Sequence, residues 1–382
     1  MITKVPHYYK EFKCIASECT DTCCAGWEII IDEETFDKYK KVTSPFAERL
    51  HSKITIYEDG EPGFALESNA NCPFLNNKNL CDIYSELGED HLCYTCQQFP
   101  RFTNEYGSTR EIGISMSCPE AARIMLKDDT KVTFESSEDE KLVSTYNDIN
   151  VNLYIQLLGC RKITLEIMQN RDIELEHRIS LILSFAHDIQ EKIDEDALNE
   201  IADIKKKYAN SDFQSDYIKS LPHYKLNKDD EHKLLIDYKN TFLNIDHLTE
   251  GWPLLIEQSF IESILNNYST KYHEFKTYYK EKEYEFEHLI VYFIFRYFME
   301  AAIDYDLYAK IKLAAVSFII IKELDIARYI NNGEFTTEDN IDIMHLYSKE
   351  IEHSDDNMEA LAEIFNTEEI FSLRPLLSLI NL

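Results

Sequence analysis

The cysteines of this chain are crowded into its first third, and no other feature constrains the fold as strongly. Nine of the ten lie in the first 118 residues, in two dense groups and one later position. They are Cys14, Cys19, Cys23 and Cys24, then Cys72, Cys81, Cys93 and Cys96, and finally Cys118. Packing or disulfide stapling would spread thiols more evenly along the chain. The distribution therefore predicts a local inorganic site in the amino-terminal part, with Cys160 as an ordinary buried thiol.

The spacing of the cysteines narrows the chemistry of that site. The first group reads C-x4-C-x3-C-C and the second reads C-x8-C-x11-C-x2-C. Thiolate sulfur is a soft donor that suits iron–sulfur clusters and zinc, and not magnesium or calcium. One 4Fe-4S cluster takes four thiolates, or three when one iron is left open. The surplus thiols could hold a zinc ion or a second cluster, or could be buried as small apolar side chains.

A disulfide framework is the main alternative for the thiols. The segment MITKVPHYYKEFKC has neither an apolar stretch nor a small-residue cleavage site, so we expect a cytoplasmic protein. In a reducing compartment, clustered cysteines are more often metal ligands or catalytic groups than structural bridges. A bridge between the adjacent Cys23 and Cys24 would also be strained. These arguments favour the metal site.

The composition changes near residue 128. Six of the nine glycines and six of the nine prolines fall in residues 1–119, which is typical of a segment of turns and short elements. Beyond that point apolar residues recur with helical period. We expect a mainly α protein, with a loop-rich cysteine-cluster domain over residues 1–127 docked on an all-helical domain over residues 128–382. No large parallel sheet is expected.

The clearest helical stripe lies in residues 175–193, where Leu175, Ile179, Ile182, Ala186, Ile189 and Ile193 are spaced by three or four. Similar stripes cover Leu142–Leu158, Trp252–Tyr268, Tyr284–Ile303, Leu307–Ile330 and Ile341–Ile351. Strands are expected only in the first part, for example over Trp27–Asp32 and Lys53–Tyr57. The most apolar stretches, Leu289–Met299 and Leu313–Ile321, are interrupted by Arg296 or are too short to span a bilayer, so we expect buried helices and no membrane partner.

The net charge of −31 limits the choice of partner. Nucleic acid and anionic membrane surfaces would be repelled, whereas a partner rich in lysine would be attracted. The simpler interpretation is that the acidity keeps the protein soluble. The oligomeric state cannot be predicted from these features.

The words around the cysteines resemble a known family. CTDTCCAGWEIIID (Cys19–Asp32), CPFLNNKNLCDIYSELGEDHLCYTCQQFPRF (Cys72–Phe102) and SCPEAARIML (Ser117–Leu126) are similar to the flagellin lysine-N-methylase (FliB-like) family. That family shares its cysteine-rich half with the YkgJ-type group of zinc- or iron-binding proteins. The resemblance is close over residues 8 to 135. It is weaker afterwards, where Leu289–Phe298 is similar to an LxxYxxxRYF stretch.

The resemblance implies a protein-lysine N-methyltransferase that moves a methyl group from S-adenosylmethionine to surface lysines of flagellin. It also implies a cysteine-held 4Fe-4S cluster, with zinc as an alternative or companion metal. The implied ligand candidates are Cys14, Cys19, Cys23, Cys24, Cys72, Cys81, Cys93, Cys96 and Cys118. Arg101 and Arg123 match family words, and their planar guanidinium groups suit the carboxylate of the methyl donor. Arg123 could instead pair with Glu120.

No catalytic base can be assigned from the residues alone. A lysine ammonium has no lone pair, so the site must remove a proton before methyl transfer. Asp21, Asp82, Tyr84 and Tyr94 lie near the cysteines in sequence and are candidates. His91 could compete with the thiols as a ligand. Since no G-x-G-x-x-G follows an expected strand, an ordinary Rossmann cradle for the donor is not expected.

Two other classes of function remain open at this stage. One is a non-catalytic module in which zinc or iron only organises the amino-terminal segment while the acidic helices bind a basic partner. The other is a redox or metal-delivery protein that uses the same thiols. Iron and sulfide content, followed by binding of S-adenosylmethionine, would distinguish the enzyme from both.

Overall fold

The computed structural model describes all residues except 28, 58–59, 69, 141–148, 250 and 261–267. Its strands are β1 (Ile2–Pro6), β2 (Ile54–Ile56), β3 (Pro62–Phe64), β4 (Arg101–Tyr106), β5 (Thr109–Ile114) and β6 (Phe134–Glu138). The helices of the first part are α1 (Glu33–Lys40), α2 (Ala47–Ser52), α3 (Asp82–Leu87), α4 (Tyr94–Gln98) and α5 (Pro119–Leu126). Those that follow are α6 (Val151–Met168), α7 (Leu175–Asp194), α8 (Ile201–Tyr208), α9 (Ser211–Ser220), α10 (Lys228–Asn244), α11 (Gly251–Ser259), α13 (Tyr268–Tyr278), α14 (Tyr284–Tyr297), α15 (Ala301–Asp304), α16 (Leu307–Asn332), α17 (Thr337–Glu352), α18 (Asp355–Thr367) and α19 (Leu373–Ile380). The mainly α class is confirmed.

Most of the expected helices form where the period places them. The stripe from Leu175 becomes α7, and the stripes from Tyr284, Leu307 and Ile341 become α14, α16 and α17. The start of the stripe Leu142–Leu158 and residues 261–267 of the stripe Trp252–Tyr268 lie outside the described residues. The described parts of the two stripes fall mainly in α6 and α11, and Tyr268 begins α13.

The sheet structure differs from the expectation in detail. Lys53–Tyr57 contains β2, but Trp27–Asp32 is wrong as a strand, because its described residues make a single bridge from Ile30 to Gly63. Asp32 then ends the segment by accepting a hydrogen bond from the Thr35 amide at the start of α1. A second sheet was not expected. It has the order β4-β5-β1-β6, with β1 and β5 parallel and the other pairs antiparallel.

β6 lies beyond residue 128 and still joins the amino-terminal sheet, because it pairs along the whole of β1. Alternation of apolar and polar residues is weak in this strand, FESSE, so its pattern resembles a loop. Only the partner strand identifies it.

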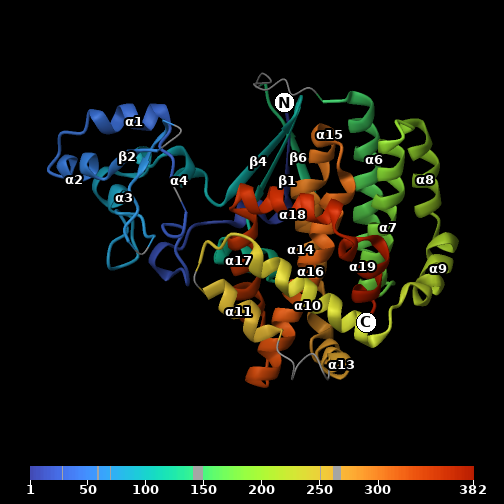
Figure 1. Cartoon of the computed structure of the whole chain (residues 1–382). Helices are drawn as coiled ribbons and strands as arrows, with labels where there is room; N and C mark the ends of the chain where they lie inside the picture. The colour runs from blue at the N-terminus through green and yellow to red at the C-terminus, as the bar shows by residue number, and fades with distance from the viewer. Residues whose placement is uncertain (28, 58–59, 69, 141–148, 250, 261–267) are drawn as a thin grey trace.

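α16 is the central helix of the body (Figure 1). Its first turn is capped by Asp306, whose side chain accepts from the Ala309 amide at 3.0 Å, and it ends at Gly333 in the left-handed conformation with φ +78°. All its residues from Leu307 to Ala327 except Lys310 are buried, and the helix packs against α7, α14 and α17. The surrounding helices therefore cover nearly the whole surface of α16, including that of its few charged residues.

The buried residues that the structure describes form two separate cores. The smaller one lies within residues 29–96 and contains Phe64, Phe74 and several cysteines. The larger one joins α6–α19 to α5 and to parts of the four-stranded sheet. Figure 1 shows the smaller core as a lobe of α1–α4 with β2, set beside the helical body. The predicted boundary at residue 128 stays a prediction. No helix in the described part of the chain is long and apolar enough to cross a membrane.

Candidate functional site

A short backbone pairing joins the two cysteine motifs. Ala25 and Asn71 form a bridge, and the Cys72 amide donates to the Cys24 carbonyl at 2.7 Å. Gly26 adopts φ +87° and donates its amide to Ala70 at 3.0 Å. A side chain at that angle would be strained, which explains the glycine after the CCA word. Thiols that are distant in sequence thereby become neighbours.

Five cysteines meet in the smaller core, and we call them the inner thiol group: Cys24, Cys72, Cys81, Cys93 and Cys96. The Cys93 and Cys96 sulfurs are 3.4 Å apart, and Cys93 is fully buried. Burial raises the pKa of Cys72 to about 12, with a further contribution from the charges of Cys24, Cys81 and Cys93. A metal cation would reverse this penalty, because it stabilises thiolates directly.

The remaining four amino-terminal cysteines form an outer thiol group: Cys14, Cys19, Cys23 and Cys118. Cys118 precedes α5, and burial raises its pKa to about 11, with added contributions from the charges of Cys19 and Cys14. Cys23 interacts electrostatically with Cys14 and Cys118 and is hydrogen-bonded to Cys24. That hydrogen bond raises the pKa of Cys23 and lowers the pKa of Cys24 to about 7. The adjacent pair Cys23–Cys24 therefore connects the two groups.

All ten cysteines are free thiols. Cys160 is far from both groups in the chain, inside α6, where burial raises its pKa to about 12. The donors gathered in the lobe are soft sulfur atoms, several of them shielded from water, and this donor set fits an iron–sulfur cluster or zinc. Sequence reasoning grouped the cysteines by their order along the chain, and these groups differ from the inner and outer groups because Cys24 lies with the second motif and Cys118 with the first.

Asp21, within the first cysteine motif, connects the lobe to α17. Its carboxylate accepts from His345 Nε2 at 2.8 Å and from Lys349 Nζ at 2.7 Å. Burial alone would raise the pKa of Asp21, but these hydrogen bonds and positive charges hold it well below its usual range. The other ring nitrogen of His345 donates to the Ser117 carbonyl at 2.7 Å. Since one oxygen, Oδ2, accepts both hydrogen bonds from α17, Asp21 acts as a tether between the two parts.

His353 stands at the same junction, just beyond the end of α17. Its Nε2 contacts the Ser117 hydroxyl at 2.5 Å, and its ring packs against Trp27 and Phe99 with centroids 5.4 and 5.7 Å away. Trp27 in turn donates from Nε1 to the Cys23 carbonyl at 2.9 Å. Burial, followed by the charges of Arg296, Lys349 and His345, lowers the pKa of His353 to about 4. Its ring is therefore neutral near pH 7.

A network of buried polar groups lies beside His353. Arg296 pairs with Glu352 at 3.0 Å, and its guanidinium also donates to the Ser115 and Tyr292 hydroxyls. Glu352 is fully buried and accepts from Tyr292 and Tyr297. Phe102, Tyr292 and Tyr297 surround the guanidinium at 4.8 to 5.9 Å. This network keeps a positive charge at the junction of lobe and body.

The two arginines expected near the methyl donor differ in their surroundings. Arg123 donates to Glu120 at 2.8 Å and to Glu338 at 2.7 Å. Such pairing with acids is the alternative to binding the carboxylate of the methyl donor. Arg101 opens β4, where its guanidinium lies 5.2 Å from the Phe12 ring. Among the described residues no carboxylate is within ion-pair distance of Arg101, so its guanidinium is available to a ligand.

The other candidates have structural contacts of their own. Asp82 binds Arg49 at 2.6 Å and Asn76 at 2.8 Å, and the His91 carbonyl accepts from the Tyr39 hydroxyl. Tyr84 and Tyr94 are exposed on the lobe surface.

His345, Lys349, His353 and Glu352 were not identified from the sequence, since they lie on an unremarkable amphipathic helix and its end. Arg296 did carry a signal, as the charge inside the most apolar helix.

Comparison with known proteins adds a second kind of observation. A family model described as the FliB lysine N-methylase C-terminal domain matches residues 161–379, more than half of the 382 residues. A Lysine-N-methylase from Salmonella typhimurium is 28% identical over 206 residues, which are 52% of this chain and 51% of that protein. A Lysine-N-methylase from Salmonella choleraesuis is 27% identical over 206 residues. The chain thus spans about half the length of these two relatives.

A shorter relative is covered more completely. The Flagellar biosynthetic protein FliU of Salmonella muenchen is 31% identical over 136 residues, which are 32% of this chain and 76% of that protein. No solved structure matches the chain.

Proposed function

The chain belongs to the FliB lysine N-methylase family, and from this premise we propose that it is a protein-lysine N-methyltransferase that uses S-adenosylmethionine. The match over residues 161–379 carries the proposal. In the reaction, the lysine nitrogen forms a bond to the methyl carbon, the carbon–sulfur bond breaks, and the sulfur keeps the electron pair as S-adenosylhomocysteine leaves.

The substrate proposed is flagellin, in the cytoplasm before export. Two observations support this choice. One relative is named a flagellar biosynthetic protein, and a net charge of −31 attracts a substrate whose target residues are lysines. Ten free thiols are the state that a reducing compartment maintains.

For the metal, we propose that the inner thiol group holds a 4Fe-4S cluster and the outer group a second metal, iron or zinc. The inner group is the better cluster site because Cys72 and Cys93 are buried in an apolar core that excludes water. The outer group includes the exposed Cys14 and Cys23. When bound, such a cluster supplies Lewis-acidic iron and cross-links that order the lobe.

The substrate amine is proposed to bind beside His353. A lysine ammonium with a reference pKa near 10.4 must lose its proton to solvent first. The burial and the positive charges that keep His353 neutral favour the neutral amine as well. Because Nε2 already contacts the Ser117 hydroxyl, the nitrogen proposed to accept from the amine N–H is Nδ1, with the ring proton on Nε2 donated to Ser117. That bond would orient the nitrogen lone pair for attack.

Flagellin incubated with the cluster-replete protein and S-adenosylmethionine is expected to gain mass on lysines in steps of one methylene. The rate at low substrate concentration should fall as salt rises, because screening removes the long-range attraction to an acidic enzyme. Intact-mass and peptide mass spectrometry measure both effects. Free lysine is the control substrate and should react far more slowly. Equal rates would exclude a recognition surface for folded protein, and failure to modify flagellin by protein that binds the donor would exclude flagellin as substrate.

Replacing His353 by Phe is expected to lower kcat/KM by about tenfold or more, because a hydrogen bond to the reacting amine is lost. Phenylalanine keeps the ring against Trp27 and Phe99, so packing is largely preserved. His353→Asn returns an oxygen acceptor and should recover part of the loss. If both variants had wild-type kinetics, His353 would play no part in orienting the substrate amine.

The pH dependence of unfolding gives an independent check on the state of His353. Its pKa is about 4 in the folded protein, below the ordinary value near 6.5. Between these values the unfolded chain binds a proton that the folded chain does not, so the contribution of His353 to stability falls as the pH drops from about 6.5 to 4. The His353→Phe variant should lack this part of the acid destabilisation in urea titrations.

A further inference from the structure

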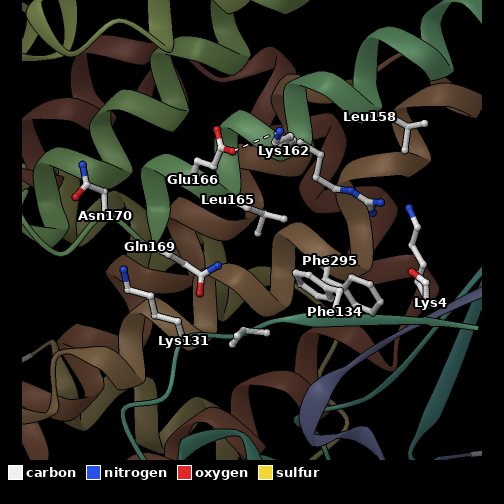
Figure 2. Close-up of a pocket in the computed structure, with 13 residues that line it drawn as sticks. Lys4, Lys131, Phe134, Leu158, Lys162, Leu165, Glu166, Gln169, Asn170 and Phe295 are labelled. Atoms are coloured by element: carbon white, nitrogen blue, oxygen red, sulfur yellow. Dashed lines mark ion pairs between the residues drawn. The ribbon is translucent and has the colours of Figure 1, made fainter.

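A cleft of about 840 Å³ lies between the sheet and α6, and its lining includes none of the cysteines of the two thiol groups (Figure 2). Lys4 of β1 and Phe134 and Ser136 of β6 line one side, and one stripe of α6 that includes Leu158 and Leu165 lines the other. None of the residues assigned to the thiol groups or to the junction with α17 lines it. Its volume falls in the range of about 300–1,000 Å³ that small-molecule sites occupy. The cleft is therefore large enough for a ligand of its own.

The lining of the cleft is basic in a strongly acidic protein. Among the described residues that line it are Lys4, Lys131, Arg161 and Lys162, against one acid, Glu166. Arg161 is committed to Glu111 through two short hydrogen bonds. The three lysines are held more weakly. Lys4 is 4.0 Å from Glu111, Lys162 is 3.8 Å from Glu166, and no carboxylate among the described residues pairs with Lys131. Their ammonium groups are available to an anion.

The cleft also offers a surface for a planar ring. Phe134 and Phe295 stack with centroids 4.8 Å apart and planes 19° apart, and Figure 2 shows the two rings side by side in the lining. Leu158 and Leu165 add apolar surface from α6. Gln169 contributes a buried Oε1 that has no hydrogen-bond partner in the described part of the chain. A buried acceptor without a partner is costly, and an amino group on a ligand would satisfy it.

We propose that this cleft binds a nucleotide-like ligand, meaning an anion that carries both a planar base and a phosphate or carboxylate group. The lysines bind the anionic end, the Phe134 face stacks on the base, and Gln169 accepts from an exocyclic amine. Neither the cysteines nor lysine methylation enters this argument, so the assignment can fail while the proposed function stands. The methyl donor is itself one ligand of this chemistry, and the experiment separates it from another nucleotide.

Calorimetry with three probes tests the combination of charge and ring. ADP carries both, adenosine only the ring, and inorganic pyrophosphate only the charge. ADP is expected to bind more tightly than either of the others, and added salt should weaken it. Lys131→Glu and Lys162→Glu should each raise the dissociation constant of ADP by about tenfold, which corresponds to the loss of one charge-assisted hydrogen bond. Both positions are exposed, so folding is not at risk.

Lys206→Glu is the matched control, because Lys206 is equally exposed but lies on α8. It should leave ADP binding unchanged. S-adenosylhomocysteine, tested on the same variants, distinguishes the source of the ligand. If S-adenosylhomocysteine binds Lys131→Glu more weakly than the unchanged protein, the cleft holds the carboxylate of the methyl donor. If its binding is unchanged, the cleft belongs to a separate nucleotide. The proposal is overturned when neither ADP nor S-adenosylhomocysteine loses affinity in the two cleft variants, or when Lys206→Glu weakens them equally.

Discussion

Protein purified without oxygen is expected to be brown and to carry about four irons and four sulfides per chain, and Cys93→Ser should lose most of both. Cys93 is fully buried, 3.4 Å from the Cys96 sulfur, and shares the smaller core with Phe64 and Phe74. A serine hydroxyl is a poor substitute for a soft thiolate ligand. Iron and acid-labile sulfide assays, together with visible absorbance, measure the loss.

The same substitution should unfold the lobe while the helical body survives, because the two cores are separate. Metal binding contributes on the order of 10 kcal/mol to the folding of small thiol-ligated domains. Limited proteolysis should therefore cut Cys93→Ser within residues 29–96 and leave a resistant fragment of the body. Cys160→Ser is the control. It changes a buried thiol outside both groups and should retain metal, colour and protease resistance. Colourless wild-type protein with stoichiometric zinc would contradict the cluster.

Glu352→Ala is expected to lower the free energy of unfolding by about 3 kcal/mol, because it leaves the Arg296 cation inside the protein without its counter-charge. The Glu352 side chain is fully buried, whereas that of Arg296 remains 14% exposed, which places the cost at the lower end for such pairs. Tyr292 and Tyr297 lose their acceptor at the same time. Urea unfolding followed by circular dichroism measures the change.

Two further variants serve as controls for the effect of Glu352→Ala. Asp203→Ala removes the acid of an exposed pair with Lys206 and should cost less than about 1 kcal/mol. The double variant Arg296→Met, Glu352→Leu removes both charges and should be more stable than Glu352→Ala. If Glu352→Ala lowered the free energy of unfolding by less than about 1 kcal/mol, water would already reach Arg296. The junction would then be hydrated, and the prediction would be wrong.

The resemblance to the flagellin lysine-N-methylase family is confirmed by the family match over residues 161–379. That match lies in the half of the chain where the resemblance of the sequence to the family was weaker. The cysteine motifs that suggested the family lie in the other half. The metal, its ligand set and the methyl donor stay predictions.

The helices could be read from the sequence because their signal is local. The spacing of apolar residues from Leu175 to Ile193 depends only on near neighbours, and so do the caps at Asp306 and Gly333. The prediction of a soft-metal site also rests on local information, because it depends on residue type and on the crowding of thiols in one segment, and it stays a prediction.

Contacts between distant segments were decided only by the tertiary structure. The bridge at Ala25 and Asn71 assigns Cys24 to the inner thiol group while Cys23 stays with the outer one. Asp21 meets His345 across more than three hundred residues of chain. β6 becomes a strand because β1 is beside it. No pattern of near neighbours encodes such pairings, because each depends on the packing of whole elements that first have to fold.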